Sequence, residues 1–210
     1  MMLSRPPQPP VLTGFEHINR YWDVKHNGWA AKILPGQLYV TTDLEEVICT
    51  TLGSCLSACI RDKKMGIGGM NHFMLPIAES NASGAWDDQA TRYGSFAMER
   101  LINEIMKAGG RRENLEMKVT GGAHVIESMA NKVGQRNIDF ILAYAEVEGL
   151  EMLSQDLGDI YPRKVMYYPG SGRLRVKRLR TLHNTTLLQR EAHYVHELEV
   201  QPAVGDVELF

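Results

Sequence analysis

Residues 47–60 read Val-Ile-Cys-Thr-Thr-Leu-Gly-Ser-Cys-Leu-Ser-Ala-Cys-Ile, which is two strand-prone runs separated by a Gly-Ser break. The runs at 47–52 and 56–60 are rich in apolar and β-branched side chains, a composition typical of buried strands. Gly53 and Ser54 interrupt this pattern, and a glycine inside a strand pattern indicates a bulge or kink. The sequence therefore predicts a kinked passage between two strands, with Cys55 directly after the kink.

Further strands and helices are predicted on both sides of this passage. Pro35-Gly36 is a turn signal, and the β-prone run that follows it ends at an acidic turn, so residues 37–42 and 47–52 are expected to form a hairpin. Apolar side chains at helical spacing predict a helix from about residue 88 to 108, which Gly109-Gly110 would end. The other predicted elements are strands at 67–75, 115–120, 151–156, 164–168 and 174–179 and a helix at 137–147.

The order of these elements indicates the fold class. Strands and helices alternate irregularly, and tight glycine turns favour antiparallel or mixed pairing over a doubly wound parallel sheet. The expected fold class is α+β, a layered domain with a core of mixed or antiparallel β-sheets and about two main helices packed on the outside. We expect a disordered Pro-rich lead at residues 1–14, one domain at residues 15–180, and a peripheral C-terminal extension at residues 181–210 that could include a short helix.

Composition excludes several classes of protein. The formal net charge of −2 provides no general attraction to a phosphate backbone, so nucleic acid is not expected as a partner. The N-terminal stretch lacks the apolar run of a secretory signal, and no segment is long and apolar enough to cross a membrane. Cys49, Cys55 and Cys59 are odd in number and crowded together, which is a poor framework for disulfides. We therefore expect a cytoplasmic protein with at least one free thiol.

Cys55 and His72 are the candidates for covalent chemistry. A cysteine attacks as the thiolate, and with a pKa of about 8.5 a free thiol is mostly protonated at neutral pH. An imidazole can accept that proton and later donate a proton to a departing amine. Because His72 lies on the predicted strand 67–75, pairing between neighbouring strands could bring the two side chains together.

The Gly-Ser break adds a second reason to expect a reactive site. Glycine removes a side chain that would crowd a substrate, and a kinked strand frees peptide N–H groups from the ladder. N–H groups near Gly53 and Ser54 could then stabilise the oxyanion of a tetrahedral intermediate, and Asn71 is a further candidate for lining the pocket. The cysteines and the histidine could also have purely structural roles. Free cysteines such as Cys49 and Cys59 commonly lie in the core, and a histidine in an apolar strand is commonly structural.

Several short motifs occur in the order found in one known family. They are Leu52-Gly53-Ser54-Cys55, Cys59-Ile60-Arg61-Asp62, Gly69-Met70-Asn71-His72-Phe73-Met74-Leu75-Pro76, Thr91-Arg92-Tyr93, Val119-Thr120-Gly121-Gly122-Ala123, Gly134-Gln135-Arg136-Asn137 and Arg163-Lys164-Val165. On these motifs, the chain from about residue 35 to 179 resembles the CheD family of chemoreceptor glutamine deamidases.

The resemblance implies a protein-glutamine glutaminase that converts specific glutamines on the cytoplasmic helices of chemotaxis receptors to glutamates, and so tunes chemotaxis signalling. It implies Cys55 as the nucleophile, His72 as the histidine, and a threonine just upstream of the cysteine. Thr50 is the first choice for that threonine and Thr51 the alternative, and only one of them can face the pocket because strand positions alternate. The family implies no cofactor and no metal. It also implies work at receptor arrays and docking to the phosphatase CheC.

Three other functions stay open at this point. A non-catalytic adaptor or regulator of chemoreceptor arrays would keep the motifs without the reaction. A metal site built from the three cysteines and His72 lacks the Cys-x-x-Cys spacing of structural zinc. A cysteine protease shares the first step of attack on an amide, but nothing in the sequence indicates a cleft for an extended peptide.

Overall fold

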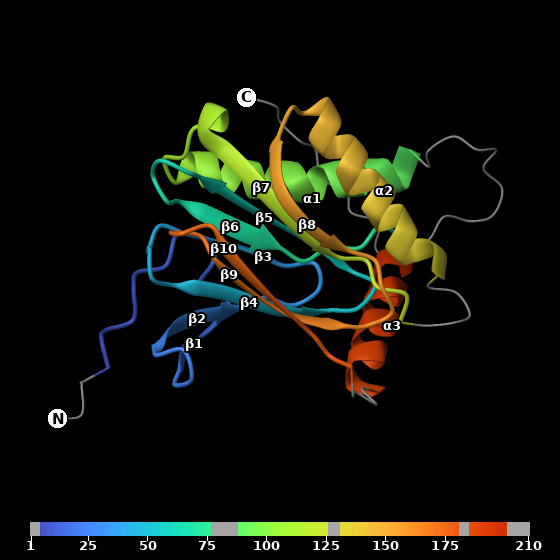
Figure 1. Cartoon of the computed structure of the whole chain (residues 1–210), viewed down its shortest axis with the longest axis horizontal. Coiled ribbons are helices and arrows are strands. Elements are labelled where there is room, and N and C mark those ends of the chain that lie inside the picture. The colour runs from blue at the N-terminus through green and yellow to red at the C-terminus, as the bar shows by residue number, and fades with distance from the viewer. Residues whose placement is uncertain (1–4, 77–87, 126–130, 181–184, 201–210) are drawn as a thin grey trace.

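Two stacked β-sheets form the centre of the molecule in the computed structural model, which describes residues 5–76, 88–125, 131–180 and 185–200 (Figure 1). The first sheet has the order β1 (Asn19–Asp23), β2 (Gly28–Lys32), β4 (Val47–Leu52), β9 (Arg163–Tyr168) and β10 (Arg173–Arg178). The second has the order β3 (Leu38–Thr41), β6 (Gly68–Asn71), β5 (Leu56–Asp62), β7 (Leu115–Gly121) and β8 (Glu151–Leu157). Both sheets are mixed, because β2–β4 and β7–β8 are parallel pairs and the other pairs are antiparallel.

Two helices cover the outer face of the second sheet and a third lies at one end of the molecule (Figure 1). They are α1 (Asp88–Lys107), α2 (Asn131–Val147) and α3 (Thr185–Val200), and a short 3-10 helix at Arg112–Asn114 leads into β7. The helix α1 buries a stripe of Met98, Leu101, Ile102 and Ile105 against the sheet, and each such side chain stabilises the fold by roughly 2 kcal/mol. The expected α+β layered fold is confirmed. None of the described helices has the length and apolar character needed to cross a membrane.

The predicted hairpin between residues 37–42 and 47–52 is wrong in its pairing, although both strands exist. Strand β3 pairs with β6 in the second sheet, whereas β4 pairs with β2 and β9 in the first. A buried carboxylate fixes the crossing between them, because Glu46 accepts hydrogen bonds from Tyr39 (2.9 Å), Thr41 (2.7 Å) and Arg20 (2.7 Å). The acidic turn therefore carries the chain from one sheet to the other.

Strands β4 and β5 also lie in different sheets, and the Gly-Ser break is the point where the chain crosses. Leu52 before the break and Leu56 after it are fully buried, so both ends of the crossing are fixed in the core. Residues 53–55 are thus neither part of a regular strand nor a solvent-exposed loop. This position between the sheets leaves their backbone groups available for contacts outside a strand ladder.

The Pro-rich lead and the start of the helix α2 differ from what the sequence predicts. The described part of the Pro-rich lead, residues 5–14, contacts the first hairpin, because Trp29 donates to the carbonyl of Pro7 (3.0 Å) and Arg20 donates to that of Pro9 (2.8 Å). Residues 1–4 lie outside the described part of the chain. The predicted helix at 137–147 begins earlier, at Asn131, and includes Gly134. An added side chain at Gly134 would collide with the backbone of Gly122, so this close approach requires a glycine.

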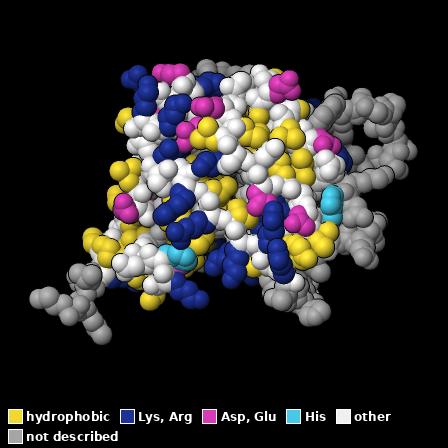
Figure 2. All heavy atoms as spheres, in the orientation of Figure 1, with side chains coloured by type: hydrophobic (Ala, Val, Ile, Leu, Met, Phe, Trp, Pro, Cys, Tyr) yellow, Lys and Arg dark blue, Asp and Glu magenta, His cyan; other side chains and the backbone are white. Residues whose placement is uncertain are grey.

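The strand β10 lies at an edge of the first sheet and carries a row of basic side chains. Arg173, Arg175, Lys177 and Arg178 are exposed, and Figure 2 shows Lys and Arg side chains gathered over this part of the molecule. Charged side chains on an edge strand disfavour pairing with a second sheet. Protection of this edge strand from pairing with another sheet therefore explains the basic row without a binding partner.

Candidate active site

The carbonyl groups of residues 53–55 each accept a hydrogen bond from another segment. Ala123 N–H donates to the carbonyl of Gly53 (2.8 Å), the Asn137 side-chain amide to that of Ser54 (2.9 Å), and Gly122 N–H to that of Cys55 (2.8 Å). These donors come from the end of β7 and from α2. Because a peptide carbonyl and the N–H of the next residue point in opposite directions, fixing the carbonyls of Gly53 and Ser54 directs the N–H groups of Ser54 and Cys55 away from these donors.

Those N–H groups form a cradle, defined here as the backbone N–H groups of residues 53–55, and a carboxylate occupies it. Glu191 of α3 accepts hydrogen bonds from Gly53 N (2.8 Å), Ser54 N (3.1 Å) and more weakly Cys55 N (3.4 Å), and the Ser54 hydroxyl adds a fourth at 2.9 Å. The Glu191 side chain is buried, with 2% of the residue exposed. The cradle is thus a built anion site of the kind that stabilises a developing oxyanion.

Two glycines are required for this geometry. A Cβ atom at Gly53 would lie 2.6 Å from a Glu191 carboxylate oxygen and would fill the cradle. Gly121 has a φ of 129° and an added Cβ there would lie 2.2 Å from the carbonyl oxygen of Cys55. Buried Arg163 supports the same turn by donating to the carbonyl of Gly121 (2.8 Å).

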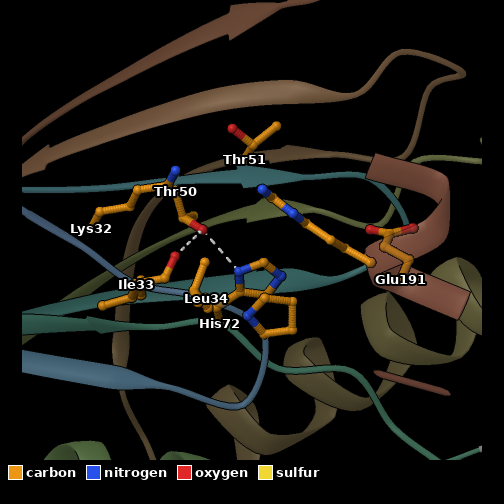
Figure 3. Close-up of a pocket in the computed structure, with 9 residues that line it drawn as sticks. Lys32, Ile33, Leu34, Thr50, Thr51, His72 and Glu191 are labelled. Carbon is orange, nitrogen blue, oxygen red and sulfur yellow. Dashed lines mark hydrogen bonds between the residues drawn. The ribbon is translucent and has the colours of Figure 1, made fainter. Parts of the chain in front are cut away.

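The side chain of His72 is oriented by Thr50, and the two meet beside a pocket that Lys32, Leu34, Thr51 and Glu191 help to line (Figure 3). The Thr50 hydroxyl donates its single hydrogen to the carbonyl of Ile33 (2.9 Å), so it accepts the second bond, from His72 Nδ1 (2.8 Å). The proton of the imidazole is therefore on Nδ1 and the lone pair on Nε2. No described residue forms a hydrogen bond with that buried Nε2.

Strand register brings Cys55 and His72 to the same face. Leu56 and Phe73 exchange two backbone hydrogen bonds of 2.9 Å in an isolated antiparallel bridge. The residues that precede them, Cys55 and His72, are diagonal neighbours across this pair and so lie on the same face. The register thus supports the predicted proximity of thiol and imidazole.

Burial keeps both groups neutral in this state. Burial, the negative charge of Glu191 and a hydrogen bond to its carboxylate raise the pKa of Cys55 well above its ordinary value. Burial lowers the pKa of His72 to about 3. The site as described therefore holds a protonated thiol and a neutral imidazole that can act as a base.

The other predicted site residues have different positions. Figure 3 shows Thr51 on the side of β4 away from His72, so Thr50 is the threonine that reaches the histidine. The Asn71 side chain accepts from Ala58 N (2.8 Å) and donates to the carbonyl of Ala97 (3.2 Å), which ties β5 to α1. Asn71 is therefore a structural link rather than a member of the cradle.

The remaining cysteines lie apart from this arrangement. The thiol of Cys49 contacts the Tyr21 hydroxyl (3.5 Å) in a small cluster on the other face of the first sheet, and Cys59 is fully buried in the main core. All three cysteines are free thiols. In the described ranges, no group of three His, Cys, Asp or Glu side chains is arranged to hold a metal ion.

Asn137 and Glu191 both bind the backbone of residues 53–55, and the sequence predicts no role for either. Asn137 lies in a motif but gave no chemical signal, because a buried amide that binds a carbonyl is recognisable only from the structure. Glu191 lies in the segment expected to be a peripheral extension, yet α3 places its carboxylate within hydrogen-bond distance of the nucleophile's own backbone. The described part of the tail, residues 185–200, is therefore next to the motifs, and residues 181–184 and 201–210 lie outside the described structure.

Comparison with known proteins shows the family of the chain. A family model described as CheD chemotactic sensory transduction matches residues 74–178. A "Probable chemoreceptor glutamine deamidase CheD" from Halorhodospira halophila is 52% identical over 206 residues, which cover 96% of this chain and 94% of the relative. Proteins with the same name from Hahella chejuensis and Hydrogenovibrio crunogenus are 50% and 52% identical and cover 99% and 85% of this chain, or 98% and 93% of the relatives. The chain belongs to the CheD family.

Proposed function

We propose that the protein deamidates glutamine side chains of chemoreceptors, with Cys55 as the nucleophile and His72 as the acid and base. The observation that carries this proposal is the cradle of three backbone N–H groups at Cys55, which already binds a glutamate side chain. The names of the relatives, chemoreceptor glutamine deamidases, supply the class of substrate. We further propose that residues 15–180 form the domain that carries out this reaction.

The reaction follows from the chemistry of the site. His72 Nε2 accepts the thiol proton, and the Cys55 thiolate attacks the carboxamide carbon of the substrate glutamine. Cradle N–H groups stabilise the oxyanion, and His72 returns a proton to the nitrogen that leaves as ammonia. Water activated by His72 then hydrolyses the thioester, which yields glutamate and the free thiol.

The product changes the charge of the receptor. Each turnover replaces a neutral carboxamide with a carboxylate, so it alters repulsion between neighbouring helices and changes signalling by the bundle. The proposed place of action is the cytoplasmic part of receptor arrays. Docking to the phosphatase CheC is a further proposal, which a pull-down with purified CheC would test.

Deamidation is measured with cytoplasmic receptor fragments and mass spectrometry of their peptides. The wild-type chain should convert specific glutamines to glutamates, and Cys55→Ala and His72→Ala should reduce the rate by about 100-fold or more because each removes a group used in bond breaking. Cys59→Ala is the matched control, since that thiol lies in the core. Full activity of Cys55→Ala would refute the mechanism, and a wild-type chain that binds fragments without converting them would favour the adaptor function.

A further inference from the structure

The Glu191 carboxylate occupies every N–H group that the proposed reaction uses. Its Oε1 accepts from Gly53 N and Cys55 N, and its Oε2 accepts from the backbone N–H and the hydroxyl of Ser54. The negative charge of the same carboxylate also acts on the Cys55 thiol and raises its pKa. One carboxylate thus contacts the nucleophile and the oxyanion site together.

This position has a chemical meaning because glutamate is what glutamine becomes after deamidation. The two side chains have the same length and the same planar end. A glutamine at this place would put its carbonyl oxygen where Oε1 lies, between the N–H groups of Gly53 and Cys55, and its carboxamide carbon beside the thiol. The Ser54 hydroxyl can turn to accept from its NH₂ group, whereas the Ser54 backbone N–H, which donates to Oε2 of the glutamate, loses its acceptor at that place.

The helix α3 presents Glu191 on one buried stripe. Glu191, Tyr194 and Leu198 are 2%, 6% and 7% exposed, and they follow the i, i+3, i+7 spacing of a helix lying in a groove. The other faces are open to solvent, with exposed residues at Gln189, Arg190, Ala192, His193, His196 and Glu197. Among the side chains of α3 that the structure describes, the buried ones lie on this stripe, with Glu191 at the reactive end.

The surface that this stripe contacts, called the groove here, includes residues 53–55, Gly36 and Tyr93. It has a second defined contact one turn along the helix. The hydroxyl of Tyr194 forms a hydrogen bond of 2.5 Å with that of Tyr93 on α1. The Tyr194 ring also lies against Gly36, where an added Cβ would be 3.1 Å from a ring carbon. The groove therefore takes a large side chain three residues after the position that reaches Cys55.

We propose that α3 occupies the substrate groove as a product-like helix, so that the substrate is a helical segment whose glutamine takes the place of Glu191. This inference rests on the proposed function and adds a competitor within this chain, α3, which holds the place of the substrate helix. While α3 is docked, the enzyme inhibits itself. A receptor helix gains access to Cys55 by displacing α3, which makes the tail a regulatory segment.

The variant Glu191→Gln turns α3 into a substrate. The sulfur of Cys55 forms a bond to the carboxamide carbon of the new side chain, the carbon–nitrogen bond breaks, and ammonia leaves with a proton from His72. Water then hydrolyses the thioester and restores glutamate at position 191. Each event raises the mass of the α3 peptide by about one dalton.

Time-resolved peptide mapping of purified E191Q tests this reaction. Glutamine at 191 should convert to glutamate at a rate that does not depend on protein concentration, while the native Gln189 on the exposed face stays unchanged. Two matched controls should show no conversion at the substituted position: E197Q, which places a glutamine on the exposed face of the same helix, and the double variant E191Q/C55A.

The outcomes separate this inference from the proposed function. A glutamine at 191 that persists while the same preparation deamidates receptor fragments would overturn the product-like role of α3 and leave the proposed function standing. Persistence together with inactive wild-type protein on receptor fragments would overturn both. Conversion at 191 in the absence of Cys55 would also contradict the inference.

Self-inhibition is tested separately on receptor fragments. If α3 fills the groove for about nine-tenths of the time, Glu191→Ala should raise kcat/KM by about tenfold. Tyr194→Ala leaves the cradle and Glu191 in place but removes the contact with Tyr93, so it should raise kcat/KM as well. An unchanged or lower value in both variants, with unfolding curves like that of the wild type, would contradict self-inhibition.

Discussion

Thr50 decides which nitrogen of His72 carries the proton. Its hydroxyl has one hydrogen, which goes to the carbonyl of Ile33, so its remaining capacity is to accept from Nδ1. The lone pair on Nε2 is then available for proton transfer, and burial with a pKa of about 3 keeps the imidazole neutral. A threonine thus takes the place that a carboxylate has in many triads, without adding a charge to a buried site.

The role of Thr50 predicts a difference between two adjacent threonines. Thr50→Val keeps the shape of the side chain but removes the acceptor for Nδ1, so the imidazole loses its fixed tautomer and kcat/KM should fall by about tenfold or more. Thr51→Val is the control, since Thr51 helps to line the same pocket but Thr50 is the threonine bonded to His72 (Figure 3), and its kcat/KM should stay within about twofold. Equal losses in both variants would contradict the orienting role of Thr50.

At the scale of elements, the cradle exists because α2 and the end of β7 hold residues 53–55 from behind. Asn137 of α2 donates to the carbonyl of Ser54 (2.9 Å) and accepts from Leu75 N (2.8 Å), so one buried amide joins the cradle to the segment after His72. Gly122 and Ala123 bind the flanking carbonyls. Geometry that serves the reaction is thus enforced by elements that do not contact the substrate.

Loss of this support should appear in stability and activity together. Asn137→Ala leaves a buried carbonyl and a buried N–H without a partner, which should reduce the free energy of unfolding by about 2–4 kcal/mol. Urea unfolding measures this change, and kcat/KM should fall because the cradle loses its fixed geometry. The control is Gln135→Ala on the exposed face of the same helix, which should change the free energy of unfolding by less than about 0.5 kcal/mol. An Asn137→Ala protein as stable as Gln135→Ala would show that the amide is not needed.

At the scale of the whole molecule, the sequence predicts local structure and misses the contacts between distant segments. The strands β4, β5 and β7 and the helix α1 agree with the predicted ranges to within two residues, because side-chain period and glycine breaks are local properties. The pairing of β3 with β6 rather than β4 depends on the buried carboxylate of Glu46 and its partners from other strands. Pairing between distant strands has no local signal.

The same reasoning explains what was missed at the site. A break in a strand and the motifs indicate Cys55 and His72, whereas Glu191 is separated from Gly53 by 138 positions in the chain. On its own helix Glu191 is one of several glutamates and has no distinguishing neighbour. Only folding places it in the cradle, so its role could be inferred only from the structure.

Docking of α3 predicts how the reactivity of Cys55 depends on a residue far along the chain. Burial, the charge of Glu191 and a hydrogen bond to its carboxylate raise the pKa of the thiol, and Glu191→Ala removes the last two causes. The pKa should therefore fall, so that at pH 8 a larger fraction is thiolate and the rate of alkylation by iodoacetamide rises, by about tenfold if the pKa falls by one unit. The midpoint of the rate-against-pH curve should move to lower pH in the same variant.

Two features of the chain make this measurement specific. Glu197→Ala changes an exposed glutamate of the same helix and should leave the alkylation rate of Cys55 unchanged. Cys49 and Cys59 are buried thiols away from α3 and report general loosening, so their rates should match those of the wild type. Equal acceleration at all three cysteines would mean that Glu191→Ala unfolds the domain. Acceleration confined to Cys55 is expected if α3 covers the nucleophile, because Cys55 is the cysteine, among those described, whose pKa the charge of Glu191 raises.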